Sequence, residues 1–154
     1  MKEERKFLNN EEKIKIENMK NYLKQLETEK YSNRFDSFSE KTEVIEWREI
    51  MEWVSSLAKL IENKQYIGIY GVPRAGLLIG TLLSYKTGLP LLLNPVKNCL
   101  VVDDDLSTGI TLLQYINRYD TAIMYKNPDC KIQPTYLYKT YGETYKTFIW
   151  NKED

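Results

Sequence analysis

VVDDDLSTGIT, residues 101–111, places three carboxylates directly after a run of apolar residues, and a hydroxyl-rich turn containing a glycine directly after the carboxylates. The four residues CLVV at 99–102 have the composition of a buried strand. In open parallel sheets, ligands bind beyond the carboxyl ends of the strands. A strand that ends in acids and runs into a donor-rich turn is therefore a strong candidate for a binding site. The competing interpretation is a solvated strand end that caps the next helix.

The segments around this stretch alternate between strand-like and helix-like patterns. We predict strands at 66–70, 91–93, 99–102, 121–125, 135–139 and 146–150, and helices at about 46–63, 76–86 and 108–118. The helix at 76–86 is apolar nearly all round, which predicts that it is well buried, and Thr87-Gly88 ends it. This alternation is typical of an α/β domain with a parallel sheet.

The first 41 residues differ from the rest, because they are rich in Glu, Lys and Asn and contain neither Gly nor Pro. Apolar residues recur there at helical spacing, at Ile16, Met19, Leu23 and Leu26. They predict an amphipathic helix over about 11–30, which either packs on its own domain or contacts a second copy or a partner. We predict a loop at 31–41. The chain is thus divided into a charged helical extension, 1–41, and a domain at 42–154.

Composition excludes several function classes. With 22 basic and 22 acidic residues, the balanced charge gives no reason to expect a nucleic acid or a membrane as partner. The sequence has no signal-peptide pattern and no apolar run near the length of a bilayer span, so we expect a cytoplasmic protein. Cys99 and Cys130 are interpreted as reduced thiols. Histidine is absent, so acid–base chemistry falls to carboxylates, Lys, Tyr or the substrate.

Two loops carry the candidate chemistry, GVPRAG at 71–76 and DDDLSTG at 103–109. Each follows a strand and precedes a helix, whose N-terminal N–H groups suit phosphate. Arg74 can bind pyrophosphate with two parallel hydrogen bonds, and Gly109 permits close backbone approach. Neither loop is a Walker or dinucleotide motif. Carboxylates beside a phosphate site make sense if they hold sugar hydroxyls or a metal. Phosphoribosyl pyrophosphate would use all these parts.

Several segments resemble one enzyme family. VVDDDLSTGIT resembles the phosphoribosyl-pyrophosphate motif of type I phosphoribosyltransferases, and IYGVPRAGL at 69–77 resembles their pyrophosphate loop. EWREIMEWVSSLAKLI, TAIMYKNPDCKIQPTYLY and TFIWN resemble segments of the xanthine–guanine and hypoxanthine branch. The resemblance covers about 44–151. It implies an α/β fold with a parallel-sheet core flanked by helices and a small β-rich C-terminal hood.

The resemblance also implies roles for individual residues. Asp103 and Asp104 would contact the ribose hydroxyls, with Asp104 also close to Mg²⁺. The 5′-phosphate would lie against Ser107, Thr108, Gly109, Ile110 and Thr111. Pyrophosphate would be held by Arg74, Ala75 and Gly76.

For the nucleobase, Lys126 matches the lysine that contacts the 6-oxo group of a purine. Trp150 matches the tryptophan of the closing strand, which makes Tyr145 the base-stacking aromatic residue and Phe148 its rival. The expected catalytic residues are Asp103, Asp104, Asp105 and Lys126. The implied reaction is Mg²⁺-dependent transfer of phosphoribosyl to a 6-oxopurine-like base, in a homodimer.

Some positions depart from the family pattern. Ser107 stands where the purine-salvage branch usually has an Asp, and a hydroxyl is a poor general base. Asp105 adds a carboxylate two residues earlier, where a tight turn would direct its side chain elsewhere. Ala75 replaces a glycine, and Ile149 and Asn151 replace Pro and Glu. Two alternatives therefore stay open: a catalytically weak module that senses phosphoribosyl pyrophosphate or nucleotides, and an enzyme for another base such as a pyrimidine.

Overall fold

The computed structural model describes residues 43–144 and 146–151, together with residues 10, 14, 17–21 and 24. The chain divides into two compact units, residues 1–39 and 40–154. In the first unit the described residues are helical and exposed, Met19 among them. The rest of the helix predicted at 11–30, with Ile16, Leu23 and Leu26, lies outside the described residues, as does the loop predicted at 31–41.

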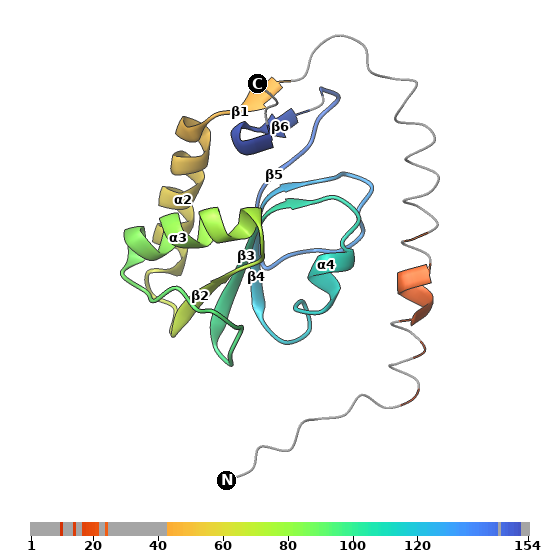
Figure 1. The fold of residues 1–154 in the computed structure, drawn as a ribbon, viewed down its shortest axis with the longest axis horizontal. Helices are drawn as coiled ribbons and strands as arrows, with labels where there is room; N and C mark the ends of the chain where they lie inside the picture. The colour runs from red at the N-terminus through yellow and green to blue at the C-terminus, as the bar shows by residue number, and fades with distance from the viewer. Residues whose placement is uncertain are drawn as a thin grey trace. The chain divides into compact units, whose positions relative to one another are not determined.

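A four-stranded parallel sheet forms the centre of the second unit (Figure 1). Its strands, in spatial order, are β2 (Gly68–Gly71), β3 (Cys99–Leu106), β4 (Asp120–Lys126) and β5 (Tyr136–Thr140). The strand predicted at 91–93 reduces to one parallel bridge, between Leu91 and Ile69. Pro90 and Pro95 flank this segment, and proline has no N–H with which to extend a ladder.

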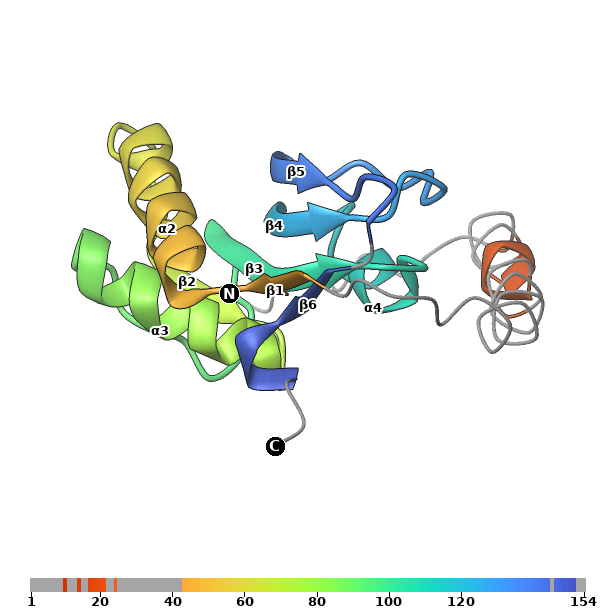
Figure 2. The ribbon, with the colours of Figure 1, turned by 90° about the horizontal axis from the view of Figure 1, so that it is seen from above.

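Helices cover both faces of the sheet (Figure 2). The helices α2 (Trp47–Ile61) and α3 (Ala75–Thr87) pack on the face to which β3 contributes Leu100 and Val102. The short helix α4 (Ile110–Leu113) lies on the opposite face, against Ile123 of β4. A strand covered on both faces is apolar along its length, as CLVV is. Among the described residues, no helix is both long and apolar enough to cross a bilayer.

Two helix predictions need correction. The helix predicted to be buried all round, α3, exposes Leu77, Leu78 and Tyr85, because only one of its sides meets the sheet and α2. The helix predicted at 108–118 has only four residues, and hydrogen-bonded turns replace the rest, such as Tyr119 N–H to the Tyr115 carbonyl at 3.0 Å. Thr, Ile, Tyr and Asn in this segment have low helix propensity. The other strands and helices lie within a few residues of their predicted positions.

A second, two-stranded sheet lies beyond the carboxyl end of the main sheet (Figure 1). It pairs β1 (Glu43–Ile45) with β6 (Lys146–Phe148) in parallel, and we call it the β1–β6 ribbon. The sequence analysis missed β1, which is too short for a periodic pattern. The strand predicted at 146–150 ends at Phe148 and continues as a single 3₁₀ turn, η1 (Ile149–Asn151).

Candidate functional site

The three consecutive acids lie within β3. The ladder between β3 and β4 pairs Asp103 with Ile123 and Asp105 with Tyr125, and it continues to Leu106. The prediction of a tight turn at Asp105 is therefore wrong, because pairing with β4 keeps this residue extended. Side chains alternate along a strand, so Asp103 and Asp105 project from one face and Asp104 from the other.

The carboxylate of Asp103 is buried and lies beside Asp104. Its Oδ1 accepts a hydrogen bond from the backbone N–H of Asp104 at 2.9 Å. Burial, followed by the negative charge of Asp104, raises the pKa of the Asp103 carboxyl to about 8. A site that raises an acid's pKa in this way favours a proton, a hydroxyl donor or a cation beside it.

The predicted pyrophosphate loop packs directly on the end of β3. Val72 N–H donates to the carbonyl of Val102 at 2.9 Å. A Cβ on Gly76 would lie 2.7 Å from that carbonyl oxygen and 3.0 Å from Asp103 Oδ1. Within the loop, Arg74 is exposed and is joined to Pro73 by a cis peptide bond. Ala75 begins α3 and has no positive φ, so the strain that a replaced glycine could bring is absent.

The predicted phosphate loop follows Leu106 immediately. Gly109 has a φ of 88°, and a Cβ there would lie 2.3 Å from Ile132 Cδ1, so both conformation and space require glycine. Ser107, Thr108 and Ile110 are half-buried, and Thr111 is exposed. Because α4 is short, its dipole adds less than the full-length helix that the sequence predicts. Any phosphate here would depend mainly on backbone N–H groups and hydroxyls.

Lys126 lies at the carboxyl end of β4, beside Leu106 of β3 and Thr140 of β5. Lys126 is only 5% exposed, so it is a buried residue and not a surface charge. Lysines are rarely buried without a functional or structural reason. The sheet therefore brings Lys126 to the same edge as the three acids.

The structure describes only one of the two residues that were predicted to stack on the base. Phe148 is 2% exposed, and its ring stacks on Trp150 with 4.8 Å between centroids. The prediction that Phe148 could stack on the base is therefore wrong, because its buried ring offers no open face. Tyr145 lies outside the part of the chain that the structure describes.

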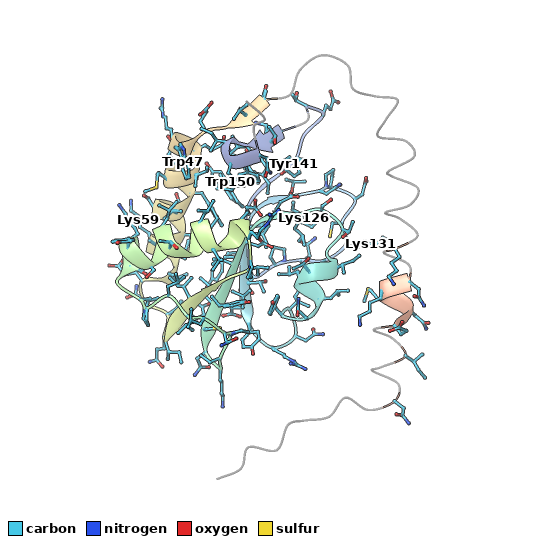
Figure 3. The ribbon with its side chains drawn as sticks, viewed as in Figure 1. Trp47, Lys59, Lys126, Lys131, Tyr141 and Trp150 are labelled. Atoms are coloured by element: carbon cyan, nitrogen blue, oxygen red, sulfur yellow. The ribbon has the colours of Figure 1, made fainter. Side chains whose placement is uncertain are left out.

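Trp150 is a site residue that the sequence analysis used only to align the closing strand. Its indole Nε1 donates a hydrogen bond to Asp104 Oδ2 at 3.2 Å. Figure 3 shows Trp150 near Trp47 and Tyr141, above the carboxyl end of the sheet where Lys126 lies. A sequence separation of 46 between Asp104 and Trp150 hides this contact from any local pattern.

The described residues contain no group of three or more His, Cys, Asp or Glu side chains placed to hold a metal ion. Adjacent carboxylates on Asp103 and Asp104 supply the hard oxygen ligands that Mg²⁺ prefers. Mg²⁺ commonly binds through one or two carboxylates together with the phosphates of a substrate. The residues present therefore fit a Mg²⁺ ion that a phosphate-containing ligand brings with it.

No protein-family model matches the sequence, and no curated protein matches it. Among solved structures, the chain is similar to a purine phosphoribosyltransferase from Pyrococcus horikoshii, with a TM-score of 0.64 and 21% identity over 73% of this chain and 96% of that one. A xanthine-guanine-hypoxanthine phosphoribosyltransferase from Helicobacter pylori gives 0.62 and 17%, over 71% and 93%. The chain has the type I phosphoribosyltransferase fold. This confirms the predicted α/β fold with a parallel-sheet core flanked by helices.

The chain is also similar to a protein from Neisseria gonorrhoeae whose structure contains bound ppGpp. That similarity has a TM-score of 0.55 and 14% identity, and covers 75% of this chain and 93% of the other. In this fold the two predicted ligand loops and the acids of β3 meet at one edge of the sheet, as the sequence predicts.

Proposed function

We propose that this chain is a Mg²⁺-dependent phosphoribosyltransferase that acts on a 6-oxopurine-like base. One observation carries the proposal: Gly76 of the pyrophosphate loop packs against Asp103, in a fold shared with purine phosphoribosyltransferases. A ligand that spans the loop and the acids must combine phosphate groups with hydroxyls. Phosphoribosyl pyrophosphate has both.

In this proposal each part of the ligand has its own contacts. The carboxylates of Asp103 and Asp104 accept hydrogen bonds from the ribose hydroxyls, and the segment 107–111 donates to the 5′-phosphate. Arg74 and the N–H groups of Ala75 and Gly76 hold pyrophosphate. Asp104 also helps to seat Mg²⁺, which supplies positive charge to the leaving pyrophosphate when bound.

The reaction breaks the bond between C1 of the ribose and the pyrophosphate oxygen, and a nitrogen of the base forms the new bond to C1. The proton that this nitrogen loses passes to the released pyrophosphate or to water. Arg74 stabilises the negative charge that grows on pyrophosphate, and the fold holds base and sugar in line. Buried Lys126 donates a hydrogen bond to the 6-oxo group of the base. The protein thus contributes orientation and charge, and a histidine is not needed.

The direct test incubates the protein with Mg²⁺, phosphoribosyl pyrophosphate and a panel of purine and pyrimidine bases, and follows pyrophosphate release. Release with guanine, hypoxanthine or xanthine supports the proposal, and the double variant Asp103→Asn/Asp104→Asn is the control that should be inactive. Binding of phosphoribosyl pyrophosphate without release for any base would rule out the enzyme. Release that survives in the double variant would overturn the site.

Ser107 is the position where turnover is most open to improvement. Ser107→Asp places a carboxylate where the purine-salvage branch has one. We expect it to raise kcat with guanine or hypoxanthine by about tenfold, less than the about 100-fold or more that a fully positioned general acid or base contributes. Steady-state kinetics measure this. Ser107→Asn is the matched control, being similar in size but unable to accept a proton. An equal rise in both variants would show that basicity is not what limits the reaction.

A second candidate function is a regulatory module that binds nucleotides without turning them over. Ser107 favours it, as does the similarity to a protein with bound ppGpp. This function predicts measurable affinity for phosphoribosyl pyrophosphate or guanine nucleotides without pyrophosphate release from any base. Calorimetry alongside the release assay separates the two functions.

We also propose that two copies pair through the outer face of α3 and the segment that follows it. Leu77, Leu78, Tyr85 and Leu93 are exposed there, and Leu93 is 92% exposed. An apolar surface of this kind is typical of a protein–protein interface. We expect Leu93→Glu to halve the mass measured by light scattering, whereas Leu60→Glu on α2 should leave it unchanged. A parent chain that is monomeric at high concentration would contradict the dimer.

A further inference from the structure

We propose that Trp150 is a positioning residue for the ribose site: its indole N–H holds the carboxylate of Asp104 in the orientation that receives the sugar. The inference rests on the proposed function, since it assigns Asp104 to the ribose. It adds a residue of η1 to a site otherwise built from the carboxyl ends of β2, β3 and β4.

The contact itself is direct. Trp150 Nε1 lies 3.2 Å from Asp104 Oδ2, and Asp104 is only 9% exposed. An indole has one N–H donor and no acceptor, so it binds a carboxylate oxygen without competing for the proton of a ligand hydroxyl. A hydrogen bond to an ionised group is stronger than one between neutral groups. It is made by Oδ2, one of the two oxygens of the Asp104 carboxylate.

Aromatic packing fixes the indole in place. Its ring stacks on Phe148 with a centroid distance of 4.8 Å and an interplanar angle of 9°, and Trp47 lies at 5.7 Å. Phe148 in turn meets the ring of Tyr125 edge-on at 6.2 Å. Trp47 begins α2 and Phe148 ends β6, so two separate elements restrict the indole (Figure 3). A donor held this firmly can orient its acceptor.

Asp104 lies among other acids of β3, and a fixed hydrogen-bond donor therefore helps to orient its carboxylate. Asp103 and Asp105 flank it in sequence, so Asp104 is a nearly buried member of a cluster of three acids. Without a fixed donor, Asp104 would rotate towards whichever donor or solvent lies nearest. The Trp150 hydrogen bond opposes that rotation and places positive N–H character beside the cluster.

The experiment compares Trp150→Phe with the parent chain. Phenylalanine retains an aromatic ring for Phe148 and Trp47 but removes the N–H. Binding of ribose 5-phosphate, measured by calorimetry, should weaken about tenfold, as expected for a hydrogen bond to a charged group. Binding of inorganic pyrophosphate, which contacts the 71–76 loop instead, should not change. In turnover assays, KM for phosphoribosyl pyrophosphate should rise more than kcat falls.

A double-variant cycle with Asp104→Asn tests whether the effect passes through Asp104. In that background, Trp150→Phe should cause no further loss of ribose 5-phosphate affinity. Phe148→Leu, which removes the stacking partner but not the N–H, controls for packing and should lower thermal stability more than ribose affinity.

Each contrary outcome has a distinct meaning. Unchanged ribose 5-phosphate binding in Trp150→Phe overturns the inference and leaves the proposed function intact. Equal weakening of ribose 5-phosphate and pyrophosphate, or additive losses in the cycle, would show a merely structural role and overturn it as well. A parent chain that binds neither compound overturns the proposed function, and this inference with it.

Discussion

The variant Asp103→Asn is expected to lose at least about 100-fold in phosphoribosyl transfer and yet to be more stable than the parent chain without ligand. In the proposed function, the loss follows from removing an acceptor for the ribose hydroxyls. The gain follows from removing a carboxyl whose pKa is raised to about 8 by burial and by the charge of Asp104. One substitution should therefore move activity and stability in opposite directions.

The gain in stability from Asp103→Asn depends on pH. Between pH 4 and about 8 the native Asp103 binds a proton more tightly than the unfolded one, so the stability contributed by this group falls as pH rises through that range. Asparagine carries no such proton. The advantage of Asp103→Asn should thus be absent near pH 4 and largest above pH 8.

Urea denaturation at pH 5 and pH 8.5, without ligand, measures the effect. Glu143→Gln is the control, because Glu143 is an exposed acid outside the site and its replacement should change stability little at either pH. If Asp103→Asn proves less stable than the parent chain at pH 8.5, the carboxylate is stabilised by neighbours and the electrostatic argument is wrong.

Gly71→Ala is expected to destabilise the fold by about 3 kcal/mol or more and to abolish ligand binding. Gly71 is buried at the end of β2, and a Cβ there would lie 2.3 Å from the carbonyl oxygen of Gly76 and 2.7 Å from Leu77 Cα. These obstacles are backbone atoms at the start of α3, so rotating a side chain cannot relieve the clash. The helix would have to move away from β2 and take the pyrophosphate loop with it.

Thermal and urea denaturation measure the loss of stability. Calorimetry with pyrophosphate measures whether the 71–76 loop can still bind this ligand. Gly142→Ala is a matched control, because nothing lies within 4 Å of a Cβ built there and its φ is not positive. That variant should be neutral or slightly stabilised, since alanine restricts the unfolded chain. A Gly71→Ala protein as stable as the parent chain would show that α3 shifts freely.

The central sheet could be predicted from the sequence because the patterns that identify its strands are local. The run CLVV before Asp103 identifies a buried strand, and Gly109 marks a turn that has a positive φ in the structure. Lys126 was connected with the site only through the family resemblance, and the structure places it at the same sheet edge as the acids because parallel strands end together.

Other features depend on contacts between distant segments and could not be predicted in this way. The three residues of β1 form a strand only because Lys146 to Phe148 lie beside them. The hydrogen bond from Trp150 to Asp104 requires the whole domain to fold first. The exposed side of α3 shows a different limit, since an apolar pattern cannot separate residues that face the core from residues that face a partner.

The β1–β6 ribbon has a consequence for the order of events during synthesis. Its two strands are the first and the last of the domain, and η1 follows the second of them. A nascent chain that has emerged only through β5 holds the complete central sheet, both ligand loops and the acids of β3, but not Trp150. The hydrogen bond from Trp150 to Asp104 can therefore form only after the residues beyond β5 have been synthesised.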